Sequence, residues 1–397
     1  MPNSQRLAAD VIVLGAGIVG VSAALALQAQ GRRVCLVDQE DPGRGTSFGN
    51  AGLIERASLV PYAMPRDPGT VLRMATNTHS ALRFQWRALP WYARWLQRYW
   101  HESAPSPLAR ATEDMRPLIE RCVAEHQPLI NAAGLQSLVR SDGWIELFRG
   151  PQTFATEAAL ARTQAEHYGL AMEVLDAHAL QARLPALRPE GGISGGVHWQ
   201  DPWTVLSPFK LVQGYAHLFS SGGGDILRAD AMGLEPTDPG WQLPLPDGRS
   251  LHASDVVLAL GADTGALAEK FGYRLPLRPK RGYHLHFRID AEHPALPFPV
   301  CDSASGFVMA TMEDGIRLTT GVHLALPDAP PNYAQAEQDT RIARAFWPLG
   351  EPVEAVPWMG RRPCTPDMRP LIGPAPHHRG LWFNVGHAPH GLTLGPV

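Results

Sequence analysis

This 397-residue sequence contains few cysteines and has a small net charge. The four cysteines, Cys35, Cys122, Cys301 and Cys364, are scattered and form no CxxC pair, so neither a disulfide framework nor a zinc site is indicated. We therefore predict no bound metal and expect a reducing compartment. The 35 basic and 38 acidic residues give a formal charge of −3, which argues against nucleic acid as a partner.

Long apolar runs are also missing. No stretch of about 18 apolar residues occurs, and residues 1–10 carry no apolar core of signal-peptide length. The sequence therefore predicts a protein that neither spans a membrane nor is exported by that route, and we expect a cytoplasmic location. A chain of this length is long for one compact unit, so two domains are expected.

The sequence does contain a glycine-rich turn between two regular elements. Gly15, Gly17 and Gly20 follow the apolar run 11–14 and precede a helix-compatible run. In a βαβ unit the first glycine permits the tight turn, the second lets a pyrophosphate approach, and the third lets helix and strand pack closely. Asp38 ends the next apolar run, at about the spacing where an acidic side chain meets a ribose hydroxyl. The pattern predicts an adenine dinucleotide, without separating NAD from FAD.

The rest of the chain alternates between helical and strand-like segments. Helical signals dominate from about residue 70 to 133. The apolar run 256–260 is typical of a buried parallel strand, and because it stops at Gly261 we expect that glycine beside the dinucleotide. Alternation in 283–289 and 316–320 predicts antiparallel strands of a second domain.

Three groups of segments, far apart in the sequence, carry a common pattern. The first is the turn 15–20 with its glycine-rich continuation, the second is 256–261 with 276–283, and the third is 360–373 with 386–391. Their order and spacing resemble the FAD-dependent D-amino-acid oxidoreductase (DAO) superfamily over nearly the whole chain. The likeness is greatest to the D-amino-acid dehydrogenase and glycine oxidase branch.

This resemblance implies an α/β fold with an α+β substrate domain. A Rossmann-like FAD-binding domain is expected to interleave with a second domain of antiparallel sheet and helices. We expect the FAD-binding domain to comprise residues 7–60, 151–266 and 360–397. The substrate-binding domain is then expected to comprise residues 61–150 and 267–359. Relatives usually continue with another helix beyond the position of Pro396, whereas this sequence ends at Val397.

The resemblance also implies which residues contact FAD. Binding is expected to be non-covalent, because Gly360 stands where some relatives carry the cysteine that attaches the flavin. Backbone N–H groups of 386–391 are implied to face the flavin edge that gains negative charge on reduction. The implied cofactor-binding residues are Gly15, Gly17, Ile18, Val19, Gly20, Asp38, Gln39, Thr46, Ser47, Asn50, Ala51, Gly52, Gly261, Gly386, His387, Gly391, Leu392 and Thr393.

Three residues are implied to contact the substrate. Arg362 precedes proline in an RPxTPD-like stretch and is implied to bind a carboxylate, for which its planar guanidinium is suited. The alternative is a local pair with Asp367 or a capped turn. Tyr283 and His284 lie on a strand implied to approach the flavin, but alternation puts them on opposite faces, so only one can face the site. A solvated sheet face is the alternative for either.

The implied reaction is oxidation of the C–N bond of a small amino acid, with hydride transfer to flavin N5. A D-amino acid, an N-methyl amino acid or a cyclic imino acid would be the substrate. The alternative is a flavin-binding electron-transfer or complex subunit with little turnover of its own. A nicotinamide-linked dehydrogenase is disfavoured by the C-terminal segments. Nothing in the sequence separates an oxidase from a dehydrogenase.

An aromatic-rich segment at 91–100 has two interpretations. As a helix it gathers one apolar side, made of Trp91, Tyr92, Trp95, Leu96 and Tyr99. We favour packing of this side against the rest of the protein. The alternative is contact with an electron acceptor or a membrane surface, which would place the enzyme at the periphery of the inner membrane.

Overall fold

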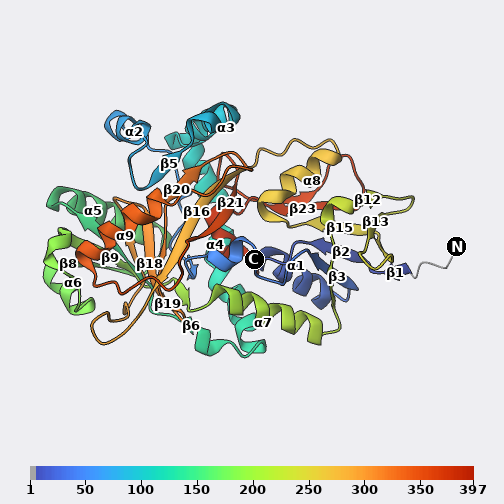
Figure 1. Ribbon diagram of the computed structural model, residues 1–397, viewed down its shortest axis with the longest axis horizontal. Coiled ribbons are helices and arrows are strands. Elements are labelled where there is room, and N and C mark those ends of the chain that lie inside the picture. The colour runs from blue at the N-terminus through green and yellow to red at the C-terminus, as the bar shows by residue number, and fades with distance from the viewer. Residues whose placement is uncertain (1–5) are drawn as a thin grey trace.

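The computed structural model describes residues 6–397, and its chain forms two large sheets side by side (Figure 1). The sheet nearer the N-terminus has six strands. Their order is β11 (Asp225–Arg228), β3 (Val34–Asp38), β2 (Val11–Leu14), β15 (Asp255–Leu258), β23 (Leu381–Val385) and β22 (Leu371–Pro374). All neighbours are parallel except β22, which runs antiparallel to β23.

Both faces of this sheet are covered. Helices α1 (Ile18–Ala29) and α7 (Pro208–Ser221), with part of α4 (Pro105–Ala132), pack on one face. The other face carries α8 (Thr264–Lys270) and a four-stranded sheet in the order β1 (Arg6–Ala8), β14 (Ser250–Ala253), β13 (Trp241–Pro244) and β12 (Glu235–Pro236). Burial on both faces explains why all four residues of β2 are apolar and inaccessible.

The second sheet has ten strands and is mostly antiparallel. Its order is β5 (Leu82–Phe84), β20 (Val322–Leu324), β16 (Arg278–Phe287), β19 (Gly315–Thr319), β18 (Phe307–Met312), β17 (Val300–Asp302), β7 (Trp144–Arg149), β9 (Ile193–Trp199) and β8 (Met172–Asp176), with β21 (Trp358–Cys364) also paired to β16. Helices α5 (Pro151–Tyr168), α6 (Ala177–Arg183) and α9 (Ala334–Phe346) lie at its outer end (Figure 1). A separate small sheet has the order β4 (Leu53–Ile54), β10 (Trp203–Val205) and β6 (Val139–Arg140).

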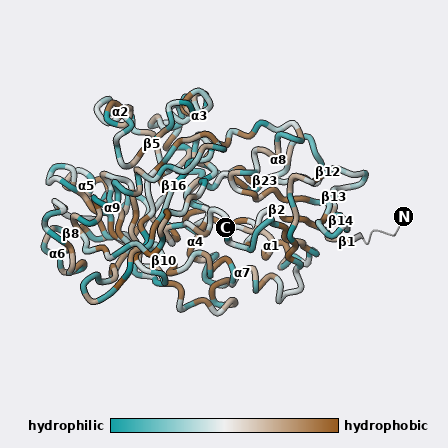
Figure 2. Tube along the Cα trace, viewed as in Figure 1, coloured by the Kyte–Doolittle hydropathy of each residue, from teal (hydrophilic) through white to brown (hydrophobic). Residues whose placement is uncertain are grey.

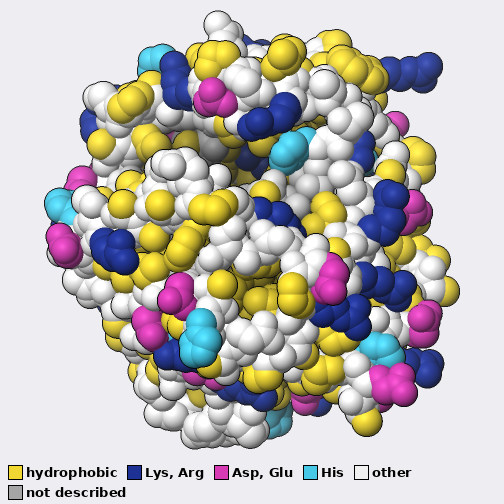
Figure 3. Space-filling model, turned by 90° about the vertical axis from the view of Figure 1, so that its left-hand side faces the viewer, with side chains coloured by type: hydrophobic (Ala, Val, Ile, Leu, Met, Phe, Trp, Pro, Cys, Tyr) yellow, Lys and Arg dark blue, Asp and Glu magenta, His cyan; other side chains and the backbone are white. Residues whose placement is uncertain are grey.

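Hydrophobic residues gather in the strands of both sheets, while the outer loops and helices are more hydrophilic (Figure 2). The face at the left of Figure 1 carries basic and acidic side chains interspersed with one another (Figure 3). This distribution agrees with the small net charge. Among the helices of residues 6–397, none has the length and apolar character needed to cross a bilayer.

The predicted fold class is confirmed: a Rossmann-like sheet interleaves with a domain of antiparallel strands and helices. The predicted helical region is made of α2 (Pro68–Ala75), α3 (Leu89–Glu102) and α4, with the short β5 between the first two. Two predicted boundaries do not match the sheet order. The predicted FAD-binding segment 360–397 includes residues 360–364 of β21, which pairs with β16 in the ten-stranded sheet. The interval 151–266 was assigned to the FAD-binding domain, yet β8 and β9 pair in the ten-stranded sheet. A helix between two strands looks the same locally whichever sheet the strands join.

Candidate active site

A cavity of about 1480 Å³ is lined by residues from both large sheets. The glycine turn after β2 and the loop 44–51 border one part of it. The strands β16 and β21 and the segment 384–392 border another. This volume exceeds that of an ordinary small-molecule pocket, and its walls differ chemically from one end to the other.

The turn after β2 has room for glycine alone at two positions. Gly15 has φ +104°, and a Cβ on it would lie 2.4 Å from the carbonyl oxygen of Ala259. A Cβ on Gly20 would lie 1.7 Å from the carbonyl oxygen of Gly15. Helix α1 can therefore start directly against the strand, with its N-terminal N–H groups toward the cavity.

Asp38 and Ser47 hold this turn in place. The Asp38 carboxylate accepts hydrogen bonds from Ala16 N at 2.6 Å and from Glu40 N at 3.1 Å. The Ser47 hydroxyl accepts from Ile18 N at 3.0 Å. Both side chains line the cavity, so the groups that orient the turn also border the space a ligand would fill.

Most of the predicted cofactor-binding residues line this cavity. They are Gly15, Gly17, Ile18, Val19, Asp38, Gln39, Thr46, Ser47, Asn50, Ala51, Gly261, Gly386, His387, Gly391 and Leu392. Gly20, Gly52 and Thr393 are not part of its wall. Gly20 lies beneath the turn, Gly52 (φ +78°) packs against Val205, and the Thr393 hydroxyl accepts a bond from Glu55 N at 3.1 Å.

Arg362, on β21, lies across the neighbouring strand β16. Its register partner is Lys280, and a Cβ on Gly282 would lie 2.6 Å from the guanidinium, so the group sits directly over that glycine. The guanidinium donates to the carbonyl oxygens of Gly321 at 2.9 Å and Thr320 at 3.1 Å. Burial lowers its pKa, and within residues 6–397 no carboxylate forms an ion pair with it. The predicted alternative, a pair with Asp367, is not seen; Asp367 pairs with Arg369 instead.

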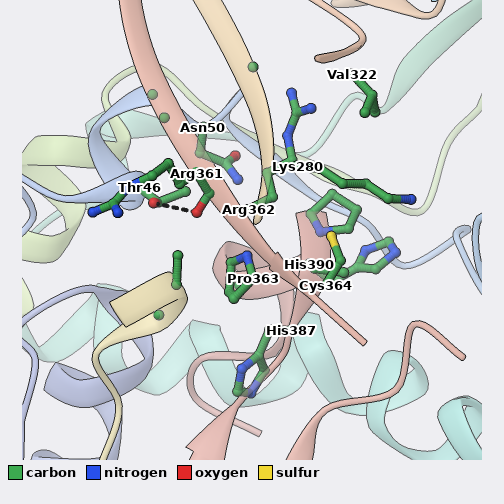
Figure 4. Close-up of a pocket in the computed structure, with 18 of the residues that line it drawn as sticks. Thr46, Asn50, Lys280, Val322, Arg361, Arg362, Pro363, Cys364, His387 and His390 are labelled. Atoms are coloured by element: carbon green, nitrogen blue, oxygen red, sulfur yellow. Dashed lines mark hydrogen bonds between the residues drawn. The ribbon is translucent and has the colours of Figure 1, made fainter. Parts of the chain in front are cut away.

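Lys280 projects from β16 beside Arg362 (Figure 4). Its side chain is 9 % exposed, and its ammonium lies 4.1 Å from the ring centre of Tyr99 and 5.2 Å from that of Trp95. Burial lowers the pKa of Lys280 to about 8. No acidic side chain of the described chain pairs with it, so two neighbouring cations face the cavity without an anion.

His284 and Tyr283 are separated as alternation predicts. His284 shares the face of Lys280, but Phe48 and Trp358 stack against its ring at 5.8 and 5.0 Å, and it is not part of the cavity wall. Tyr283 borders the cavity. However, its hydroxyl is 2.7 Å from His323 Nδ1 and accepts from Asn332 N at 3.2 Å.

His286 and Glu354 lie beside His284, and one ligand atom from each of the three falls within 4.8 Å of the others. Both nitrogens of His286 are already engaged. Its Nδ1 bonds Glu354, and its Nε2 accepts from Arg317 Nε at 2.9 Å. A cationic guanidinium bonded to a candidate ligand opposes a second cation, so we do not interpret this cluster as a metal site.

His387 and His390 lie in the loop after β23, and both are 4 % exposed and line the cavity. Burial lowers the pKa of each to about 4. A loop histidine is more often a surface residue, but these two are buried because α3 and the segment around Tyr62 cover the loop; Tyr62 stacks on His390 with 5.6 Å between the ring centres. Both imidazoles are therefore neutral at pH 7.

The aromatic side of α3 packs inward, as favoured from the sequence. Trp95 Nε1 donates to Cys364 O at 3.1 Å, and the Tyr99 hydroxyl donates to Tyr62 O at 2.9 Å. Tyr92 is fully buried and donates to the carbonyl oxygen of Pro279. This helix therefore forms a wall of the cavity above the two cations.

Sequence reasoning missed several side chains of the cavity wall, chiefly Lys280, Glu55, Glu146 and Tyr62. None of the four had a usable local signal, since even His284, which shares the face of Lys280, is not part of the cavity wall. Their segments come together only in the folded chain.

The residues present fit an adenine dinucleotide that carries a flavin. The glycine turn and the uncapped N-terminus of α1 suit a pyrophosphate. Asn384, on β23, has a buried Oδ1 with no partner in the described chain and faces the same cavity. The Thr46 hydroxyl donates to Arg361 O at 2.9 Å, which ties the dinucleotide loop to the strand that bears Arg362 (Figure 4).

Comparisons with known proteins agree with this geometry. A D-amino acid dehydrogenase of Chromohalobacter salexigens is 28% identical over 398 residues, covering 97% of this chain and 92% of the relative. A D-amino-acid oxidase of Bradyrhizobium diazoefficiens is 28% identical over 403 residues, covering 99% of this chain and 93% of the relative. The crystal structure of glycine oxidase from Geobacillus kaustophilus shares the fold, with a TM-score of 0.73, 20% identity, and coverage of 98% of this chain and 92% of that one. The sequence pattern of the family described as FAD dependent oxidoreductase matches residues 10–397, and this chain therefore belongs to the FAD-dependent oxidoreductases of the DAO family.

Proposed function

We propose that this enzyme oxidises the C–N bond of a small amino acid, with a D-amino acid as the first candidate. The observation that carries the proposal is Arg362, a half-buried guanidinium without a carboxylate partner in the described chain, in the same cavity as the dinucleotide turn. The names of the curated relatives, D-amino acid dehydrogenase and D-amino-acid oxidase, support the choice of substrate.

In this mechanism Arg362 binds the substrate carboxylate and Lys280 adds a second positive charge beside it. The inward side of α3 excludes water, which strengthens both interactions. Bound FAD would supply the acceptor for one hydride, which is two electrons and one proton, leaving the substrate α-carbon. His387 and His390 stay neutral, so each can donate one hydrogen bond toward the negative charge that forms on reduction but adds no positive charge there.

Anaerobic screening of the purified holoenzyme tests this function. D- and L-amino acids, N-methyl amino acids and cyclic imino acids would be mixed with it under nitrogen. We expect bleaching of the flavin absorbance by at least one D-amino acid. Bound FAD that no amino acid reduces would favour the alternative, an electron-transfer or complex subunit. Acid precipitation should release the FAD, because attachment is proposed to be non-covalent.

We also propose that the outer surface of α2 and α3 contacts an anionic lipid surface. Leu72, on α2, is 70% exposed, and Trp86, just before α3, is 65% exposed; the exposed Arg73 lies on α2, and the exposed Arg94 and Arg98 lie on α3. Cosedimentation with vesicles containing anionic lipid tests it. Binding that Trp86→Ser with Leu72→Ser abolishes would support the contact, and absence of binding by the unaltered enzyme would refute it.

A further inference from the structure

The cavity has an acidic region as well as a cationic one. Glu55, just after β4, and Glu146, on β7, both line it. Glu146 and Cys301 are register partners on neighbouring strands, so their side chains share the face of the sheet that borders the cavity. Ser58 donates to Glu55 at 2.6 Å, and among the described residues neither glutamate has a basic partner.

Three strands separate the two regions within the ten-stranded sheet. Lys280 lies on β16 and Glu146 on β7, and the sheet order places β19, β18 and β17 between them. Arg362 lies beside Lys280 as its register partner on β21, and Glu55 raises the pKa of Glu146. Tyr62 lines the same cavity; Glu55 and Glu146 raise the pKa of its phenol, after burial, and Arg362 lowers it.

This spacing is too long for the α-amine of the substrate. A carboxylate held by Arg362 has the α-amine on the adjacent carbon, in the vicinity of the guanidinium. Three intervening strands separate Glu146 from Lys280, so only the far end of a substrate side chain can reach it. Two carboxyl groups in a site closed from water are unfavourable unless a cation or shared protons compensate them.

We propose that the substrate is an amino acid with a cationic side chain, a long amine or a guanidine, whose end group binds between Glu55 and Glu146. This rests on the proposed function for the carboxylate end. Arg362 and Lys280 then hold one pole of the substrate and the glutamate pair holds the other. The opposite charges of the two regions also fix the direction in which a zwitterionic chain enters.

Binding of a ligand that cannot be oxidised separates this inference from the proposed function. 6-Aminohexanoate has the carboxylate and the distal ammonium of lysine but no α-amine, and hexanoate lacks the ammonium. Titrated into the holoenzyme and followed by calorimetry, 6-aminohexanoate should bind at least about tenfold more tightly than hexanoate. Glu146→Gln should remove most of this difference. Glu113→Gln, the same change at an exposed position on α4, should retain it.

Turnover supplies the second measurement. The rate of anaerobic flavin reduction by D-lysine divided by that by D-norleucine should exceed about ten in the unaltered enzyme and fall in Glu146→Gln. Burial raises the pKa of both glutamates to about 7, so the ratio should increase from pH 6 to pH 8 as they ionise. The pH series needs no variant, so it still tests the inference if a substituted protein fails to fold.

Two results would overturn the inference. One is equal binding of hexanoate and 6-aminohexanoate; the other is a D-norleucine rate that equals the D-lysine rate at every pH. Selective 6-aminohexanoate binding in an enzyme that no amino acid reduces would support the acidic region and refute the proposed reaction. Flavin reduction by neutral amino acids, without selective binding of 6-aminohexanoate, would support the proposed reaction and refute the role of the acidic region.

Discussion

The two ends of the cavity are built in different ways. At the dinucleotide end, backbone groups and short side chains act: Asp38 accepts a hydrogen bond from Ala16 N, and Ser47 accepts one from Ile18 N. At the substrate end, charged side chains on paired strands face the cavity with their opposite charges outside bonding reach of one another. At the dinucleotide end the hydrogen bonds that shape the turn form without a ligand. At the substrate end the charged side chains have no counter-charge from the described chain until a ligand binds. Selectivity is therefore concentrated at the second end.

The largest effect is expected from Gly20→Ala, a substitution that disrupts the dinucleotide end of the cavity. Gly20→Ala places a methyl group 1.7 Å from the carbonyl oxygen of Gly15, so α1 cannot start where it does. We expect a loss of more than about 4 kcal/mol in the free energy of unfolding, or no folded protein. Thermal denaturation and FAD content measure this. Gly45→Ala is the control, since a Cβ there meets nothing within 4 Å; normal FAD content in Gly20→Ala would contradict the prediction.

Arg362→Ala breaks the substrate end alone. Two charge-assisted hydrogen bonds to a carboxylate are worth about 3–6 kcal/mol together, so kcat/KM should fall by about 10² to 10⁴. FAD content should stay near one per chain. Arg361→Ala is the matched control, because Arg361 forms an exposed pair with Asp263 at 2.7 Å. An Arg362→Ala enzyme with unchanged kcat/KM would refute the assignment.

A pH series sharpens the role of Lys280. Its pKa is lowered to about 8, so the side chain loses its charge as the pH rises through that value. The KM should therefore increase by about tenfold between pH 7 and pH 10. Lys280→Arg keeps its charge over this range and should give a flatter profile. The same KM increase in both enzymes would assign the titration to another group.

The smallest effect on turnover is expected at Tyr283, one of the three predicted substrate residues. Tyr283→Phe removes the bond to His323 and leaves Asn332 N without its acceptor. Stability should fall by about 1–2 kcal/mol, while kcat/KM changes by less than about threefold. Urea denaturation and steady-state kinetics test this. A large loss of kcat/KM at unchanged stability would instead make Tyr283 a substrate-binding residue.

The dinucleotide end could be predicted because its signals are local. A turn that only glycine can adopt, and an acidic residue at the end of the next strand, are separated by a couple of dozen residues and lie in one βαβ unit. The same reasoning failed at β8 and β9. The helix α5 ends at Gly169 (φ +64°) as its sequence predicts, but nothing local tells which sheet its flanking strands join.

The substrate end was only partly predictable. Arg362 was predicted because its stretch of sequence resembles that of the family. Alternation along the strand predicted that His284 and Tyr283 lie on opposite faces. Lys280 became significant only as the register partner of Arg362, some eighty residues away. Glu55, Tyr62 and Glu146 belong to three separate segments, and loop histidines such as His390 cannot be recognised as buried until the covering helix is known.

By itself, the sequence determined the fold class, the dinucleotide turn and the inward side of α3, because backbone conformation and periodic burial are properties of neighbouring residues. The tertiary structure decided the electrostatic layout of the cavity. Strand register places Lys280 beside Arg362 and Glu146 beside Cys301. Burial then weakens the ionisation of these groups, and within residues 6–397 Lys280, Arg362 and Glu146 form no ion pair. Charges separated in sequence act on one ligand only once the fold has excluded water between them.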